Sequence, residues 1–181
     1  MKKLSLILSF IIIATFISAE SEISFKKLEN LAKKGNLSAQ IKLANSYRKG
    51  IRVTQDYKTA VKWFTLAAEQ GDAVSQYNLG IMYSFGLGVV PDYKPAVKWY
   101  TMAAEQGNPL AQYNLGRLFY LGKGVPENLV YAHMWANQAS SNGFDMGSEL
   151  TELLTELMTA NQIEEATRLG NECVIKKYKG C

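Results

Sequence analysis

The residues that could perform chemistry in this chain are few, and their types exclude several kinds of site. The sequence has two cysteines, Cys173 and Cys181, and one histidine, His133. A closed zinc site needs four such ligands, so these three residues cannot form one. His133 replaces the valines of two related helix positions, so we expect a partly buried, hydrogen-bonded side chain rather than a ligand. We expect no metal and no cofactor.

Two stretches spell the S-x-x-K element, in which a lysine lies one helical turn from a nucleophilic serine. They pair Ser24 with Lys27 and Ser46 with Lys49. Twelve serines and 16 lysines in 181 residues give roughly one such match by chance, and the companion S-D-N and K-T-G elements are absent. We therefore expect no catalytic residue, and a serine hydrolase is the alternative.

The first 19 residues have the pattern of an export signal. Lys2 and Lys3 precede an apolar run that ends at Ile17, and the small Ala19 stands at the expected cleavage point. The alternative is a membrane anchor, but the run has about fourteen residues and a span takes roughly 20. We expect residues 1–19 to be removed and the protein to be periplasmic or secreted.

Export predicts that the two cysteines, Cys173 and Cys181, form a disulfide, because an oxidising compartment favours disulfide formation. Eight residues of continuous helix would separate their Cα atoms by about 12 Å, which exceeds the ~7 Å limit for a bridge. The helix must therefore end near Lys177 and the chain must fold back through Gly180. Two free thiols, or a reactive one, are the alternative.

The charge of the chain gives no sign of a nucleic-acid partner. The formal net charge of +4 falls to +2 without Lys2 and Lys3, which is too weak for a nucleic-acid footprint. No motif pairs the acidic residues near the C-terminus, which have the spacing of solvated helix faces: Glu149, Glu152, Glu156, Glu164 and Glu165.

The elements that position these residues follow a 36-residue repeat, with blocks that begin at Gly35, Gly71, Gly107 and Gly143. The first two blocks share 18 of 36 residues and the second and third share 12, where chance gives about two. Each block predicts two helices with an apolar face. The columns expected in the repeat core are Leu43, Tyr47, Trp63, Leu79, Tyr83, Trp99, Leu115, Phe119 and Trp135.

Helix ends recur with the same period. Gly50, Gly86 and Gly122 suit the left-handed turn that ends a first helix. Asp56, Asp92 and Asn128 stand where a side-chain oxygen can cap the second helix. The stretch 86–91 has two of the three glycines of a phosphate loop, but its recurrence in every block favours a helix-ending turn.

These columns resemble the Sel1-like repeat, a relative of the tetratricopeptide repeat. The motif is Leu79-Gly80-x-x-Tyr83-x-x-Gly86-x-Gly88-Val89-x-x-Asp92, followed by Ala96-x-x-Trp99-x-x-x-Ala103-Ala104-x-x-Gly107. The resemblance implies an all-α fold, a right-handed α-solenoid of antiparallel helix pairs with capping helices at both ends. The expected units are a capping helix at 20–34, repeats at 35–70, 71–106 and 107–142, and C-terminal capping helices at 143–181.

The resemblance also implies a role, that of a non-catalytic scaffold which binds a protein or peptide in the cell envelope. Some cysteine-rich secreted members are linked to β-lactam binding or hydrolysis, which is one alternative. A secreted effector that engages host proteins is another.

A partner would bind the concave surface of the first helices. Helical spacing opposite the core face selects the columns three, seven, ten and fourteen residues after each leading glycine. We expect the partner surface to comprise Lys42, Asn45, Lys49, Val74, Asn78, Ile81, Phe85, Leu110, Asn114, Arg117 and Leu121. The alternative is that a neighbouring helix or the C-terminal cap covers some of these side chains.

Overall fold

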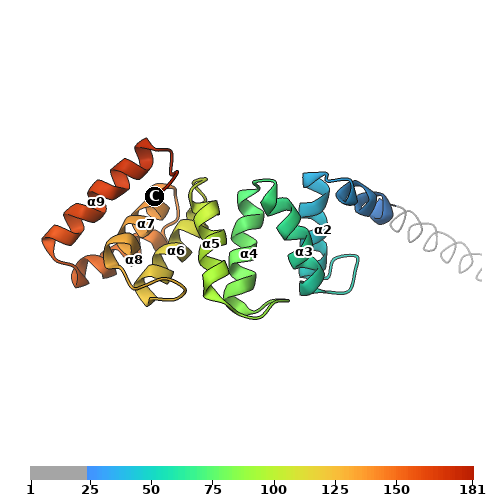
Figure 1. Ribbon diagram of the computed structural model, residues 1–181, viewed down its shortest axis with the longest axis horizontal. Helices are drawn as coiled ribbons and strands as arrows, with labels where there is room; N and C mark the ends of the chain where they lie inside the picture. Colours follow the sequence, from blue (N-terminus) through green and yellow to red (C-terminus); the bar gives the residue numbers. More distant parts are fainter. Residues whose placement is uncertain (1–23) are drawn as a thin grey trace, which may run out of the picture.

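The computed structural model describes residues 24–181, and the regular elements in that range are all helices (Figure 1). Residues 24–33 are helical and precede eight further helices. These are α2 (Leu37–Lys49), α3 (Tyr57–Glu69), α4 (Ala73–Phe85), α5 (Tyr93–Ala104), α6 (Pro109–Leu121), α7 (Leu129–Ser141), α8 (Met146–Leu157) and α9 (Ala160–Ile175). The expected export signal lies outside the described residues. No helix in 24–181 is both long and apolar enough to cross a bilayer.

The helices begin and end where the repeat columns predict. Gly50, Gly86 and Gly122 adopt left-handed φ angles of 68°, 68° and 60°, and each ends a first helix. At the start of α3, the Asp56 side chain accepts hydrogen bonds from the N–H groups of Lys58 and Thr59. Asp92 and Asn128 cap α5 and α7 in the same way, since a side-chain oxygen satisfies N–H groups that have no partner in the first turn.

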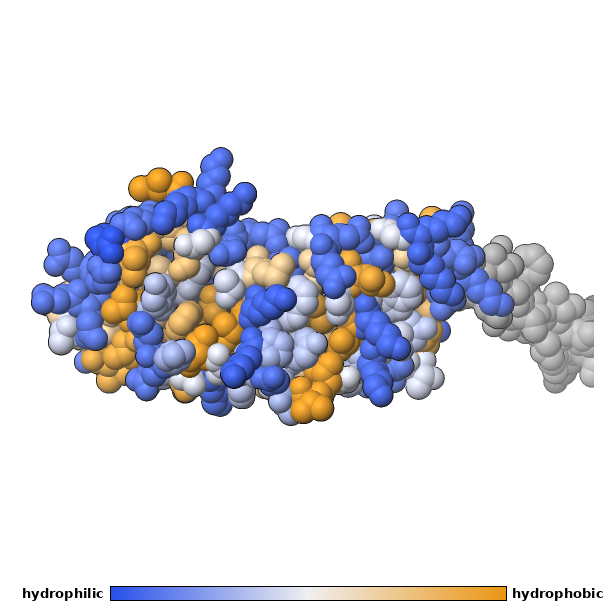
Figure 2. All heavy atoms as spheres, in the orientation of Figure 1, coloured by the Kyte–Doolittle hydropathy of each residue, from blue (hydrophilic) through white to orange (hydrophobic). Residues whose placement is uncertain are grey.

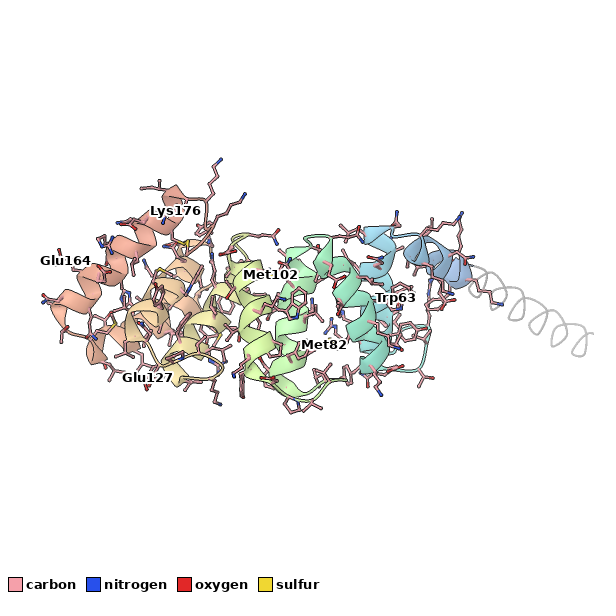
Figure 3. All side chains as sticks on the ribbon, viewed as in Figure 1. Trp63, Met82, Met102, Glu127, Glu164 and Lys176 are labelled. Atoms are coloured by element: carbon pink, nitrogen blue, oxygen red, sulfur yellow. A yellow bond between two sulfur atoms is a disulfide. The ribbon has the colours of Figure 1, made fainter. Side chains whose placement is uncertain are left out.

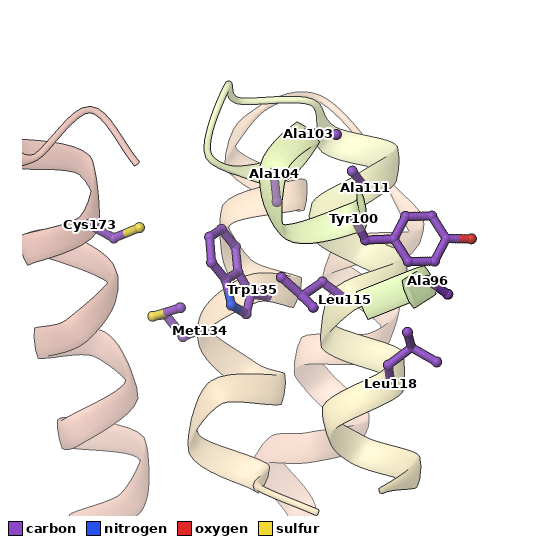
Figure 4. Close-up of a cluster of buried hydrophobic side chains, with 10 residues drawn as sticks. All are labelled: Ala96, Tyr100, Ala103, Ala104, Ala111, Leu115, Leu118, Met134, Trp135 and Cys173. Carbon is purple, nitrogen blue, oxygen red and sulfur yellow. The ribbon is translucent and has the colours of Figure 1, made fainter. Parts of the chain in front are cut away.

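The helices form a one-dimensional stack, an α-solenoid of helix pairs. Each helix from α2 to α8 packs against its neighbours along the chain, and the pairs α2–α3, α4–α5 and α6–α7 make the most extensive contacts. Small side chains allow the close approach: a Cβ added at Gly116 would lie 2.9 Å from the Ala132 carbonyl oxygen. The core is therefore continuous along the array, and Figure 4 shows one section of it.

The buried columns differ in part from the expected core. Leu43, Leu79, Leu115 and Trp135 are fully buried. The other expected core residues are partly exposed and pack on the edges of the core clusters. They are Tyr47, Trp63, Tyr83, Trp99 and Phe119.

The two partly exposed tryptophans each precede a fully buried ring. Phe64 follows Trp63, and Tyr100 follows Trp99. Figure 3 labels Trp63 on α3. A second helix touches both its own first helix and the next one, so its buried stripe is wide enough to include the neighbouring column.

A hydrogen-bond ladder of buried glutamines joins successive repeats. Gln76 donates to the Ala68 carbonyl oxygen at the end of α3, over 3.0 Å, and its own Oε1 accepts from Gln106 over 2.7 Å. The same two bonds recur one repeat earlier around Gln40 and one repeat later around Gln112. In the last case Asn142 is the donor. Each of these helix-end carbonyl oxygens also accepts from the N–H group of the glycine that follows the helix, so the glutamine supplies a second hydrogen bond.

The C-terminal end departs from the repeat, because α9 packs on α7 instead of forming a fourth pair with α8. The Gln138 amide of α7 donates to the Gly170 carbonyl oxygen of α9 over 3.0 Å. α9 ends at Ile175, and the chain turns back through left-handed residues at Lys177, Tyr178 and Gly180. The expected disulfide is present, and the Cα atoms of its two cysteines are 5.5 Å apart.

Candidate functional site

The residues expected to bind a partner all lie on α2, α4 and α6, and none of them is buried. We call this set of eleven residues the first-helix face. Its most exposed apolar side chain is Phe85, at 71%, and Val74 and Leu121 are also exposed. Ile81 differs from these, because it is half-buried and packs against the core cluster around Leu115. Leu110 is also half-buried, so the exposed apolar side chains of the first-helix face are Val74, Phe85 and Leu121.

Each repeat of this face has one asparagine, seven residues after the leading glycine in the second and third repeats and ten residues after it in the first, and its own helix fixes its orientation. The Nδ2 groups of Asn45, Asn78 and Asn114 donate to the carbonyl oxygens four residues earlier, over 2.7–3.0 Å. Asn45 also accepts a hydrogen bond from Arg48. No hydrogen bond within residues 24–181 uses Oδ1 of Asn78 or Asn114, so these two oxygens remain available as acceptors on the face.

Helix α8, which was expected only to cap the C-terminal end, also has exposed apolar side chains in the columns of the first-helix face. The same four columns counted from Gly143 hold Met146, Leu150, Leu153 and Leu157. Leu150 is buried, whereas Met146, Leu153 and Leu157 are 44–52% exposed. The spacing of these four residues matches the partner-surface columns of the repeats. They were not included in the expected surface because the loop motif is absent after Gly143. Figure 2 shows hydrophobic patches between hydrophilic residues along one view of the array.

Two cavities contain six residues of the first-helix face. One of about 170 Å³ lies between α4, α5 and α6 and brings together Phe85, Asn114, Arg117 and Leu121. The other, of about 390 Å³, lies at the N-terminal end and contains Lys42 and Asn45. The remaining residues of the face (Lys49, Val74, Asn78, Ile81 and Leu110) line neither cavity.

The two ends of the array carry opposite charge. Residues 24–55 contain eight basic residues and one acidic residue, whereas residues 143–181 contain seven acidic and four basic residues. Arg168 is paired with Glu165 and Glu172 on the surface of α9.

The two serine–lysine pairs lie at the N-terminal end of the described residues. Ser46 and Lys49 lie in the last turn of α2, and among the described residues neither side chain has a hydrogen-bond partner. The Ser46 carbonyl oxygen instead accepts from the Gly50 and Ile51 N–H groups, which ends the helix. Ser24 is exposed at the N-terminal limit of the described residues.

His133 lies in a structural contact between helices. It is buried on α7, and its Nε2 is 3.2 Å from the Thr155 hydroxyl of α8. Burial lowers the pKa of this imidazole. Within residues 24–181, no group of three or more histidine, cysteine or acidic side chains is placed to hold a metal ion.

Comparison with known proteins identifies the repeat. The family model described as Sel1 repeat matches residues 37–72, 73–108 and 109–144. The crystal structure of a Sel1 repeat protein from Oxalobacter formigenes is similar, with 35% identity and a TM-score of 0.65 over 71% of this chain and 97% of that chain. No curated protein sequence matches significantly.

A second similar structure is that of c5321, a protective antigen present in uropathogenic Escherichia coli strains that displays an SLR fold. It is 30% identical, with a TM-score of 0.56 over 85% of this chain. The matched region spans 41% of c5321, so this chain corresponds to less than half of that protein.

Proposed function

The chain belongs to the Sel1 repeat family, and from that premise we propose that it is a non-catalytic scaffold whose first-helix face binds a protein or peptide partner. Repeats of this family generally mediate protein–protein interactions. The observation that carries the proposal is the exposed apolar surface of Val74, Phe85 and Leu121, continued by Leu153 and Leu157 on α8. Apolar side chains surrounded by polar ones are typical of interaction surfaces.

We propose further that the protein acts outside the cytoplasm. Two features support this: the signal-like pattern of residues 1–19 and the disulfide between Cys173 and Cys181. Mass spectrometry of the protein purified from its native cells should find an N-terminus at Glu20 and no free thiol. An intact Met1 together with two reduced cysteines would contradict export.

The binding function is tested by affinity purification with a variant altered only on exposed positions. Ile81 is unsuitable because it packs against the core. Phe85→Glu/Leu153→Glu places two charges on the apolar surface and should abolish capture of a specific partner. A matched control, Leu66→Glu/Val174→Glu, makes the same chemical change at exposed positions outside that surface and should retain the partner.

Circular dichroism of both variants must first show helix content equal to that of the wild type. A partner lost only from the Phe85→Glu/Leu153→Glu variant supports the first-helix face. Equal capture by all three proteins, or capture no greater than background, would contradict it, and β-lactams and cell-wall fragments would then be the ligands to screen.

A further inference from the structure

The cavity between α4, α5 and α6 differs from the rest of the first-helix face because it combines an apolar rim with two cations. Phe85 and Leu121 contribute apolar walls, and Arg117 and Lys123 contribute the charges. Its volume of about 170 Å³ compares with roughly 30 Å³ for one molecule of liquid water. It therefore has room for the end of a side chain but not for a folded element.

The two cations have aromatic neighbours but no carboxylate. Arg117 lies 5.7 Å from the centre of the Tyr113 ring, and Lys123 lies 5.1 Å from that of Tyr93. The ion pairs formed within residues 24–181 are those of Arg168 on α9, and no acidic residue lines the cavity. Two exposed positive charges thus border the cavity, and no described acidic side chain forms an ion pair with either of them.

A buried phenol adds a neutral donor to the same wall. Tyr100 is 1% exposed and lines the cavity, and Figure 4 shows its ring directed away from Trp135 with the hydroxyl at the margin of the core cluster. Burial raises the pKa of Tyr100 to about 12. The hydroxyl therefore keeps its proton at physiological pH and can donate it in a hydrogen bond.

The equivalent junctions of the same chain show that the fold does not require these polar groups. One repeat earlier, the positions of Tyr100, Arg117 and Lys123 hold Phe64, Ile81 and Leu87. One repeat later they hold Ala136, Leu153 and Thr159. At these three positions the neighbouring junctions hold one polar side chain, Thr159, although the earlier junction has Arg48 and Lys49 at the positions of Ser84 and Phe85. The polar groups of this cavity are therefore specific to one junction in their placement.

We propose that this cavity binds the carboxylate of an aspartate or glutamate side chain within an extended segment of the partner. The inference rests on the proposed function and specifies the chemistry that the first-helix face recognises. A guanidinium, an ammonium and a phenol together match the two oxygens of a carboxylate, since charge-assisted hydrogen bonds are the strongest available. Phe85 and Leu121 then pack against an apolar residue next to the acid.

The surroundings of the cavity favour an internal acidic residue over the end of a chain. Exposed apolar side chains lie elsewhere on the neighbouring helices, with Val74 near the start of α4 and Leu153 on α8. The acceptor oxygens of Asn78 and Asn114 lie one repeat apart on the same face, where they can receive N–H groups of an extended backbone. A bound segment can therefore pass beyond the cavity in both directions.

A random dodecapeptide library displayed on phage tests the proposal without knowledge of the partner. In one format the peptide's C-terminus is fused to the coat protein, and in the other it is free. We expect the wild type to enrich, in the fused format, peptides with an acidic residue at one fixed position beside apolar residues. Changing that residue to its amide in a synthetic peptide should weaken binding about tenfold or more, measured by calorimetry.

The neighbouring repeat supplies the variant. Arg117→Ile/Lys123→Leu installs the residues found at the preceding junction and should bind the acidic and amide peptides equally. A control of matched charge, Lys62→Gln/Lys94→Gln, removes two cations from α3 and α5 and should keep the preference for the acid. Thermal melts establish that both variants are folded.

The outcomes separate this inference from the function on which it rests. A consensus that is apolar but not acidic, or an acidic preference that survives in Arg117→Ile/Lys123→Leu, would overturn the carboxylate site and leave the binding face standing. Enrichment only in the free format would overturn the internal side chain in favour of a chain terminus. A library that enriches nothing above bare support would overturn both the site and the binding face.

Discussion

At the scale of single residues, repeated amide side chains serve two purposes according to the face they occupy. The buried Gln40, Gln76 and Gln112 connect helix ends across repeats. Asn78 and Asn114 bond to their own helices and present an acceptor outward. Both sets recur every 36 residues, so the sequence identifies them as repeat positions. Only the packing shows which amides form buried structural hydrogen bonds and which have an acceptor oxygen free on the surface.

The glutamine ladder should contribute measurably to stability. Gln76→Ala removes two hydrogen bonds, while the Gly71 N–H group still donates to the Ala68 carbonyl oxygen. Because each such bond contributes about 0.5–1.5 kcal/mol net, the free energy of unfolding should fall by about 1–3 kcal/mol. Gln106→Ala removes the bond that the two glutamines share and a longer, exposed one to the Met102 carbonyl oxygen, but it keeps the Gln76–Ala68 bond and should have a smaller effect. Urea denaturation followed by circular dichroism measures both. Equal losses in the two variants would show that the bond to Ala68 contributes nothing.

His133 should make stability depend on pH between 7.5 and 5.5. Burial lowers its pKa below the value of 6.5 that it has in the unfolded chain, so the unfolded state binds protons more readily as the pH falls below 6.5. The melting temperature should therefore drop over this range. His133→Val, which installs the residue found at positions 61 and 97, should remove most of that dependence. An unchanged slope in the variant would assign it to other groups.

At the scale of elements, loops and helices fit together by close backbone approach across repeats. The loop at Gly88 lies on the first turn of α3, where an added Cβ would be 2.4 Å from the Tyr57 carbonyl carbon. Gly124 lies on Tyr93 in the same way. In the first repeat the equivalent residue is Arg52, which adopts the same left-handed conformation, with φ 65°. The second and third loops therefore have a packing requirement that adds to their backbone conformation.

Two glycine substitutions separate conformation from packing. Gly71 has φ 94° and open space around its Cβ position, whereas Gly88 has φ 77° and no space. Gly71→Ala should cost about 1–2 kcal/mol from the left-handed backbone alone. Gly88→Ala should cost a further 1–3 kcal/mol, roughly, because the α3 backbone must shift. Thermal denaturation compares them, and a Gly88→Ala variant as stable as Gly71→Ala would contradict the loop contact.

At the scale of the whole molecule, the C-terminal segment closes the stack by reaching back over two helix pairs. Tyr178 hydrogen-bonds to Asn142 after α7, and the Gly180 N–H group donates to Glu105 at the end of α5 over 3.0 Å. The tail also covers the core cluster that contains Trp135 and Met134. A repeat array has an unprotected apolar end unless a cap covers it, and the disulfide holds this cap in its folded-back path.

Loss of the disulfide should destabilise the protein. Cys173→Ser/Cys181→Ser removes the short ring and should lower the free energy of unfolding by about 2–3 kcal/mol, since the unfolded chain regains conformational freedom. Dithiothreitol should lower the melting temperature of the wild type to that of the variant and should leave the variant unchanged. A wild type insensitive to the reductant would show that the folded-back tail is stable without the bond.

The sequence alone determined the features that depend on residues close together in the chain or repeated at a fixed interval. The 36-residue period predicted the helix pairs, and residues such as Asp56 and Gly86 predicted where the helices begin and end. The signal-like start predicted an oxidising compartment and hence the disulfide between Cys173 and Cys181. These follow from local backbone chemistry and from the need of each helix pair to cover its apolar face.

Only the tertiary structure decided which distant side chains meet. The register of α5 against α6 brings Tyr100 beside Arg117 and Lys123, and the turn after α8 sends α9 onto α7, which leaves Leu153 and Leu157 exposed. Helical periodicity places a side chain on a face but does not fix how two helices slide or rotate against each other. That choice depends on the summed packing of many side chains from separate repeats.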